Sequence, residues 1–223
     1  MARVIAIDGP SGSGKSSTSR RVGRALGFLH VDSGALYRIM TWQCLAQGVE
    51  TSDPAAVAAC AERVQVECRP ENGALAYYVD GEVPGARIRT PEINAHASPV
   101  ATVKAVRDRI TALLRGMTRY GDLVVEGRDI TTVVFPDSPA RFYLTASPEA
   151  RARRRQLEEV ATGVANQSAE AVKASLLARD AIDSTRAYAP LRKADGVLEI
   201  DSTQLTLDQV VETVLDALPA GWR

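Results

Sequence analysis

The sequence predicts an α/β fold in which helices cover both faces of a doubly wound parallel sheet. Short apolar runs such as Val4–Ile7 and Leu123–Val125 lack the polar alternation of half-exposed strands, which indicates burial on both faces. Helical segments separate these runs along the chain, as parallel strands require. A glycine-rich loop follows the first run, at the edge where such sheets bind ligands.

The first part of the chain alternates between strand and helix. Gly27 is placed to end the first helix, since glycine readily adopts the left-handed conformation found at helix C-termini. We therefore expect strands at 4–7 and 28–31, and helices at about 16–26 and 33–48.

Residues 64–83 have a different pattern. Apolar and polar residues alternate over 64–69, which is typical of a strand with one exposed face. Asn72–Gly73 and Asp80–Gly81 flank the run 74–79, and each pair suits a type I′ turn. The sequence therefore predicts a small antiparallel meander inserted into the alternating chain.

Strand–helix alternation then resumes. Ser147 is a helix N-cap followed by a proline at the first helical position, and Thr206 with Gln209 forms a capping box. Residues 163–167 interrupt the helical pattern. We expect helices at about 101–115, from 148 onward, at 168–187 and from 206 to before Pro219, and strands at 123–126, 141–145 and 197–200.

The composition is that of an ordinary globular protein without charge bias. Of 223 residues, 45% are hydrophobic and 24% are charged, and 27 basic residues balance 27 acidic ones. A net charge of zero gives little support to binding of nucleic acid or membrane surfaces. The sequence has neither a signal-peptide pattern nor an apolar run of about 20 residues, and its three cysteines lack metal-ligand spacing. We therefore expect a cytoplasmic protein with reduced thiols.

The loop Gly9–Ser16 matches the phosphate-binding pattern G-x-x-x-x-G-K-[ST] in full. Its glycines let backbone N–H groups surround an anion, and the following helix adds its positive end. Lys15 would then lie against the β- and γ-phosphates of a nucleotide, and the Ser16 hydroxyl would bind Mg²⁺. The alternative is a strand–helix turn without a ligand, but the strand before the loop and the helix after it favour the phosphate loop.

A phosphate loop alone does not identify the second substrate. It occurs in GTPases, motors, transport ATPases and small-molecule kinases. The sequence contains no N-K-x-D guanine signature, and arginines recur at positions suited to a second phosphate. Both points favour a small-molecule kinase.

Four further segments carry candidate substrate-binding residues. Residues 32–38 place a hydroxyl near a strand end and an arginine on the next helix, and 126–129 place charges at another strand end. In 179–186, two arginines and an aspartate share one helical face, and 151–155 is rich in arginine. Each has a simpler explanation: a helix cap with a surface arginine, a solvated loop, an exposed ion-pair ladder, and a solvated helix or nucleic-acid patch.

Taken together, these segments resemble the bacterial cytidylate kinase family. The phosphate loop and residues 32–38, 127–130, 133–137 and 179–191 occur in the family's order, and the resemblance spans nearly the whole chain. It implies transfer of the γ-phosphate of Mg-ATP to CMP or dCMP by a P-loop NTPase fold. It also implies a single kinase domain over 1–223, with a core at about 1–40, 100–148 and 188–223, a nucleoside-monophosphate-binding insertion at about 41–99, and a short helical lid at about 149–187.

The resemblance implies roles for individual residues. ATP would be bound by Gly9, Pro10, Ser11, Gly12, Ser13, Gly14, Lys15, Ser16 and Ser17, with Ser16 as the metal ligand. The acceptor would be bound by Arg38, Arg128 and Arg186 at its phosphate, by Ser98, Arg107 and Asp129 at cytosine, and by Arg179 and Asp183 at the ribose, with Ser33 nearby. Catalysis would depend on Lys15, Arg128 and the lid arginines Arg151, Arg154 and Arg155.

Thr131 departs from the family pattern, in which glycine commonly follows Ile130. A β-branched residue tolerates fewer backbone conformations than glycine, so the resemblance predicts least about the shape of this loop. Rival interpretations are a kinase for UMP or another nucleoside monophosphate, a nucleotide-binding module without transfer activity, and a nucleic-acid-binding protein. We expect a monomer whose partners are ATP and CMP or dCMP, with no nucleic acid and no membrane.

Overall fold

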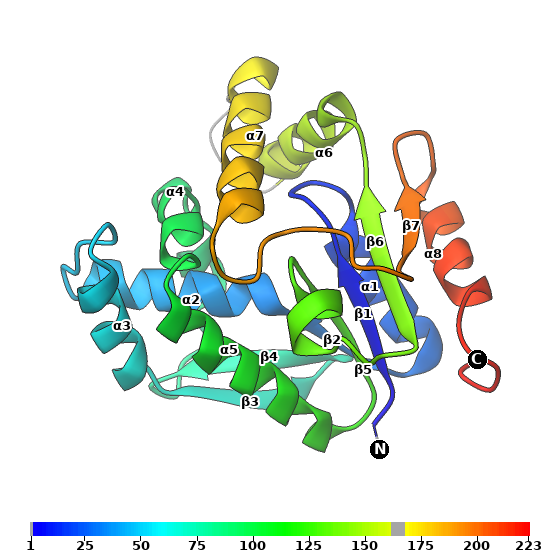
Figure 1. Ribbon diagram of the computed structural model, residues 1–223, viewed down its shortest axis with the longest axis horizontal. Helices are drawn as coiled ribbons and strands as arrows, with labels where there is room; N and C mark the ends of the chain where they lie inside the picture. Colours follow the sequence, from blue (N-terminus) through cyan, green and yellow to red (C-terminus); the bar gives the residue numbers. More distant parts are fainter. Residues whose placement is uncertain (1, 162–167) are drawn as a thin grey trace.

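The computed structural model describes residues 2–161 and 168–223. Within them, seven strands form a single sheet in the order β3-β4-β2-β5-β1-β6-β7 (Figure 1). Strands β2, β5, β1, β6 and β7 pair in parallel, and β3 runs antiparallel to β4. The strands are β1 Val4–Asp8, β2 Leu29–Asp32, β3 Val66–Glu71, β4 Ala74–Val79, β5 Leu123–Gly127, β6 Ala140–Thr145 and β7 Leu198–Asp201.

The central strands are buried because both faces of the sheet are covered. All residues of β1 and β5 are buried. Alternate residues of β1 enter different cores, since Val4 and Ala6 pack on one side of the sheet while Ile5 and Ile7 pack on the other. The predicted doubly wound parallel sheet is therefore confirmed.

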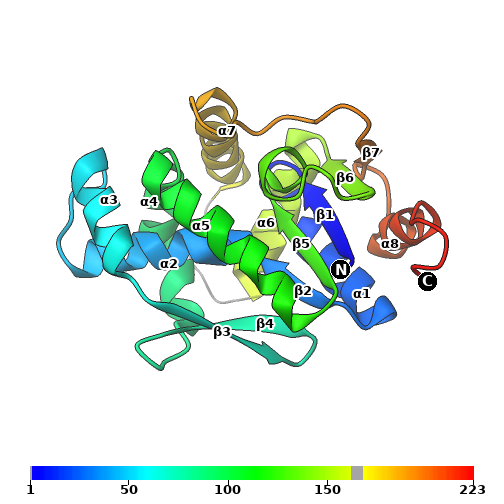
Figure 2. The ribbon, with the colours of Figure 1, turned by 60° about the horizontal axis from the view of Figure 1, so that its bottom comes forward.

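Helices α2, α3, α4 and α5 contribute to the first core, and α1 and α8 contribute to the second (Figure 2). Helices α6 and α7 pack on each other beyond the carboxyl ends of the strands (Figure 1). In the described part of the chain, no helix has the length and apolar character needed to cross a membrane. The helices are α1 Lys15–Leu26, α2 Ser33–Ala46, α3 Pro54–Arg63, α4 Pro91–Val100, α5 Lys104–Gly116, α6 Pro148–Ala161, α7 Ala169–Thr185 and α8 Leu207–Asp216.

The predicted helix signals are found where expected. The Ser147 hydroxyl accepts a hydrogen bond from the backbone of Ala150 at 3.2 Å, and the capping box before α8 is formed. Helices α3 and α4 were not predicted, although each begins with a proline behind a capping residue, Asp53 or Thr90. The interruption expected at 163–167 lies outside the described residues.

The predicted meander is confirmed as the β3–β4 hairpin. Asn72 and Asp80 have φ values of 49° and 52°, positive as type I′ turns require. The hairpin also extends the central sheet, because His30 of β2 pairs with Ala74 of β4. One residue pair makes this connection, so the hairpin is joined to the parallel strands over a short distance.

The loop after β5 is bound to the end of β1. Asp8 is buried and accepts hydrogen bonds from the backbone N–H groups of Ile130 and Thr131 at 2.8 and 2.7 Å. The Thr131 hydroxyl donates to the same carboxylate at 2.7 Å. Thr131 lies outside the left-handed backbone region, so a β-branched residue fits this position. It adds a hydrogen bond that a glycine at this position would lack.

Candidate active site

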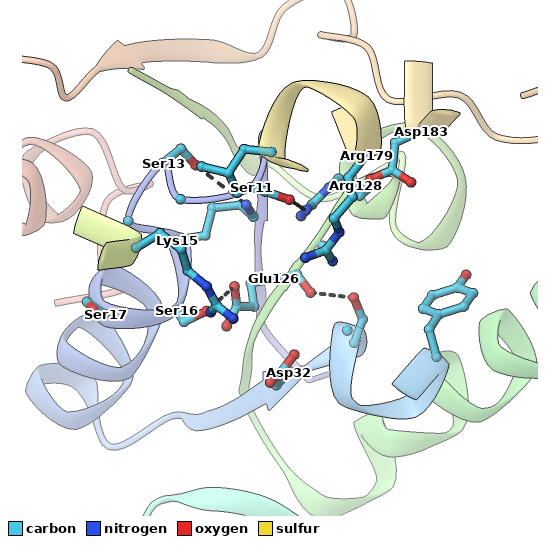
Figure 3. Close-up of a pocket in the computed structure, with 18 of the residues that line it drawn as sticks. Ser11, Ser13, Lys15, Ser16, Ser17, Asp32, Glu126, Arg128, Arg179 and Asp183 are labelled. Carbon is cyan, nitrogen blue, oxygen red and sulfur yellow. Dashed lines mark hydrogen bonds and ion pairs between the residues drawn. The ribbon is translucent and has the colours of Figure 1, made fainter. Parts of the chain in front are cut away.

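The phosphate loop lies between β1 and α1 and is built as its glycine pattern predicts (Figure 3). Gly9 has a φ of 149°, and a Cβ atom there would lie 1.9 Å from the carbonyl oxygen of Leu144. Gly14 has a φ of 93° and immediately precedes α1. Both positions therefore require glycine. The positive N-terminal end of α1 opens into a cavity, where it favours an anion.

Lys15 is buried beside this loop, and its Nζ donates to the carbonyl oxygen of Pro10 at 2.7 Å. Burial lowers the pKa of this ammonium to about 7, and the Arg128 guanidinium contributes to the lowering. Burial and a neighbouring cation both disfavour the charged form, so a bound anion would stabilise it. The polyphosphate of a nucleotide supplies such an anion.

Ser16 lies against the buried carboxylate of Glu126, which belongs to the candidate segment 126–129 but was assigned no role of its own from the sequence. Its hydroxyl donates to Oε2 of Glu126 at 2.8 Å (Figure 3). Oε1 of Glu126 lies 3.1 Å from Nε2 of His30. A hydroxyl and a carboxylate are hard oxygen ligands, and Mg²⁺ commonly uses one or two protein ligands together with phosphate oxygens. The residues present therefore fit a magnesium ion held by Ser16, with Glu126 beside it.

Two arginines meet at the carboxyl end of β2. Arg38 of α2 and Arg89 of a short 3₁₀ helix, Gly85–Arg89, bind Oδ2 of Asp32 at 2.9 and 3.1 Å. Asp32 also caps α2 through the backbone of Ala35. The prediction of Arg38 as a site residue did not include Asp32 or Arg89, and both line the same cavity.

Arg128 follows β5 and binds both the phosphate loop and α7. Its Nε donates to Oδ2 of Asp183 at 3.0 Å, and its Nη2 donates to the hydroxyl of Ser11 at 2.6 Å (Figure 3). It is thus placed between the phosphate loop and α7. The Ser33 hydroxyl, from the start of α2, donates to the carbonyl oxygen of Glu126 at 2.6 Å.

The far end of the cavity is lined by buried polar side chains. Nη2 of Arg107 lies 2.5 Å from Oδ2 of Asp129, and each of these side chains is 4% exposed. The Arg107 guanidinium also lies over the ring of Tyr37, 5.2 Å from its centroid. Ser98 of α4 is buried and lines the same cavity. The structure therefore brings together the three residues expected to bind a base.

The polar face at the end of α7 is directed inward. Asp183 and Arg186 lie 3.4 Å apart, with side chains 7% and 2% exposed, which excludes the exposed ion-pair ladder. Burial, and after it the charge of Arg128, lowers the pKa of Arg179 to about 10. Arginines that are buried close together are stabilised by a shared anion, and their planar forks suit phosphate oxygens.

The predicted lid arginines occupy two kinds of position. Arg154 and Arg155 of α6 line the cavity. Arg151 of the same helix is buried and does not line it. Its Nη1 donates to the carbonyl oxygen of Ser11 at 3.0 Å, and its Nε donates to that of Ala146 at 3.2 Å. The structure therefore places Arg151 behind the phosphate loop.

One cavity of about 500 Å³ connects these groups (Figure 3). Among the predicted site residues, Gly9, Pro10 and Arg151 do not line it. Those that do are Ser11, Gly12, Ser13, Gly14, Lys15, Ser16, Ser17, Ser33, Arg38, Ser98, Arg107, Arg128, Asp129, Arg154, Arg155, Arg179, Asp183 and Arg186.

A phosphate loop with a buried lysine at one end, and buried arginines with a polar pocket at the other, define a phosphotransferase of the P-loop kinase class. The family model for cytidylate kinase matches residues 5–220. The chain is 46% identical to the cytidylate kinase of Streptomyces avermitilis, over 96% of this chain and 91% of that one. It is 40% identical to the cytidylate kinase of Shouchella clausii, over 95% and 94%. The chain therefore belongs to the cytidylate kinase family.

A solved structure shows the same fold at low sequence similarity. An uncharacterized protein from Eubacterium ventriosum superimposes with a TM-score of 0.51 and 10% identity, over 96% of each chain. This likeness concerns the fold alone, because the identity is too low to carry the site with it.

Proposed function

We propose that this protein transfers the γ-phosphate of ATP to CMP or dCMP, giving CDP or dCDP and ADP. Both relatives described above are named cytidylate kinases, and the family covers nearly the whole chain. The observation that carries the proposal is the buried pair of Arg107 and Asp129 at the end of the cavity opposite the phosphate loop. Such a pair offers donors and an acceptor to the edge of a base.

Catalysis by this site depends on charge neutralisation and alignment. A phosphate monoester has a second pKa of about 6, so the acceptor is largely dianionic at neutral pH and needs no general base. Lys15 would bind the ATP phosphates, and Arg38, Arg128 and Arg186 would hold the acceptor phosphate. Two polyanions that repel each other in water are then held in line. Arg154 would close over the transferred group and help exclude water.

Magnesium fits the phosphate-loop end of the cavity. Ser16 would hold the ion, with Glu126 beside it to orient the hydroxyl or to bind a water of the ion. Bound there with ATP, the ion would neutralise charge on the β- and γ-phosphates. The side chains named above would perform the remaining tasks of binding and alignment.

Base selection would follow from the donors and acceptors at the far end. Cytosine carries an amino donor at its 4-position and an acceptor at N3, whereas uracil carries a carbonyl and an N–H there. An ionised Asp129 accepts from the amino group, Ser98 is a second partner, and Arg107 donates to the N3/O2 edge. Uracil would leave these buried groups unpaired or opposed, which a site of this kind rejects strongly.

An acceptor panel tests the proposal. ADP release from Mg-ATP is measured with CMP, dCMP, UMP, AMP and GMP, and the expected result is release that depends on CMP or dCMP. Release with UMP equal to that with CMP would favour the rival kinase, and nucleotide binding without acceptor-dependent release would favour a non-catalytic module. The cytoplasmic location and the monomeric state stay predictions.

A further inference from the structure

Ser11, in the phosphate loop, is held from three directions. Its N–H donates to Oδ1 of Asp180 at 3.0 Å. Its carbonyl oxygen accepts from Arg151, and its hydroxyl accepts from Arg128. Arg151 also donates to Oδ2 of Asp180. Ser11, Arg151 and Asp180 thus close a ring of hydrogen bonds that joins the phosphate loop to α6 and α7.

Asp180 acts from behind the loop. It is not among the residues that line the cavity, and its side chain is 14% exposed, while that of its partner Arg151 is 6% exposed. A carboxylate that accepts from both a backbone N–H and a guanidinium forms charge-assisted hydrogen bonds, which are stronger than neutral ones. Asp180 therefore acts on a bound substrate indirectly, by holding Ser11 and Arg151 in place.

The next turn of α7 carries Asp183, which binds an arginine expected to hold the acceptor phosphate. Asp183 accepts from Arg128, which in turn donates to the hydroxyl of Ser11 (Figure 3). Asp180 and Asp183 are three residues apart and so lie on one helical face. One turn of α7 consequently holds the loop expected to bind ATP and the arginine expected to bind the acceptor phosphate.

We propose that Asp180 is a positioning residue. It fixes the phosphate loop at Ser11 against α7 and so keeps the ATP phosphates aligned with Arg128. The part of this inference that concerns the acceptor rests on the proposed function. The expected effect of Asp180 on ATP binding does not rest on it. Displacement of a reacting group by about 1 Å can cost about a hundredfold in rate, so a contact behind the loop is able to control catalysis.

The test is Asp180→Asn, which keeps the shape of the side chain and removes its charge. Loss of a charged hydrogen-bond partner is expected to weaken binding of a non-hydrolysable ATP analogue by about tenfold or more and to lower kcat by about tenfold to a hundredfold. KM for CMP should change much less than binding of the ATP analogue, because Arg128 keeps its bond to Asp183, and neither Arg38 nor Arg107 contacts Asp180. Binding of the analogue is measured without any acceptor.

Glu149→Gln is the matched control. Glu149 also joins α6 to α7, through Lys173, but its side chain is 67% exposed and makes no contact with the phosphate loop. This variant should retain ATP-analogue binding and kcat. An equal loss of ATP and CMP affinity in both variants would mean that helix packing is responsible and would overturn the proposal.

Arg151→Lys supplies a second variant should Asp180→Asn fail to fold. It keeps the charge but loses the planar guanidinium, whose Nη1 donates to both Ser11 and Asp180 while its Nε is held by Ala146. The same loss on the ATP side is therefore expected. The double variant should cost no more than about one single variant, whereas costs that multiply would contradict the ring. Wild-type ATP-analogue binding and kcat in a folded Asp180→Asn would also overturn the proposal. ATP-side losses in a protein that does not phosphorylate CMP would refute the proposed function but support the position of Asp180.

Discussion

At the scale of single residues, Lys15 is the side chain whose loss should be most damaging. It is buried and hydrogen-bonded to the phosphate loop, and its motif position would place it against the ATP phosphates. Lys15→Ala should lower kcat by about a hundredfold or more, since charged contacts to a transferred phosphoryl group are worth several kcal/mol. Steady-state kinetics with CMP measure the loss, and circular dichroism confirms the fold. Wild-type kcat in a folded variant would remove the phosphate loop from the mechanism.

Asp129 is the residue on which base choice should depend. Asp129→Asn keeps the shape of the side chain but can turn an amide N–H toward the carbonyl of uracil. It should lower kcat/KM for CMP and reduce the CMP/UMP preference by about tenfold or more. Both acceptors are measured in wild type and variant. A constant CMP/UMP ratio would show that Asp129 does not contact the base, and its role would then be to hold Arg107.

The residues that could be predicted from sequence belong to local motifs, whereas those that were missed enter the site through contacts between distant segments. The glycine loop with Lys15 is a local pattern, so its geometry could be predicted. Arg89 could not, because its place in the site depends on a tertiary contact with Asp32, 57 positions away. Glu126 lay in a segment recognised as a strand end, but its contact with Ser16 spans 110 positions.

At the scale of elements, the end of β1 and the turn after β5 are joined by a titratable contact. Burial raises the pKa of Asp8 to about 6, although hydrogen bonds from Thr131 and Ile130 lower it. Its ordinary value is 3.8. The folded protein therefore binds this proton more tightly than the unfolded chain, and the stability contributed by protonation is lost as pH rises through about 6.

Urea unfolding of wild type and Asp8→Asn tests this linkage. The free energy of unfolding of the variant, relative to wild type, should rise by about 1 to 2 kcal/mol between about pH 5 and about pH 7.5. Other titrating groups are common to both proteins and cancel in the difference. A difference that does not change with pH would mean that Asp8 titrates alike in the folded and unfolded states.

Elements were predicted best where caps and apolar runs agree. The strands β1 and β5 and the capped helices α6 and α8 follow from local sequence. Helices α3 and α4 were missed, although they begin at Pro54 and Pro91, because their apolar residues give no clear amphipathic period over ten positions. The turn at Ile130–Val134 depends on Asp8, which is distant in sequence.

At the scale of the whole molecule, the cavity should bind a single compound in which the two substrates are covalently linked. The phosphate loop and the Arg107–Asp129 pair line the same space. Adenosine and cytidine linked through five phosphates should bind at least about tenfold more tightly than ATP, because the second nucleoside binds at high effective concentration. The ligand should therefore raise Tm more than ATP or CMP at equal concentration.

The matching adenosine–uridine compound is the control, and it should bind more weakly because its base does not suit Asp129. Equal affinity of the linked compound and ATP would show that the two ends of the cavity are not occupied together. The order of strands that creates this cavity could not be predicted, since it is set by pairings between distant segments. The alternation of strands and helices restricts the sheet to few arrangements without choosing one.

Four successive residues at the end of β5 make four different contacts in the site. Glu126 lies beside Ser16, the backbone of Gly127 passes Ser33, Arg128 reaches the phosphate loop, and Asp129 meets Arg107. Neighbouring Cα atoms are fixed about 3.8 Å apart by covalent bonds. The length of chain at this strand end therefore fixes the distance between the proposed ATP site and the proposed base site. Substitutions here can change which base is chosen, but a single-residue insertion or deletion would put both substrates out of register.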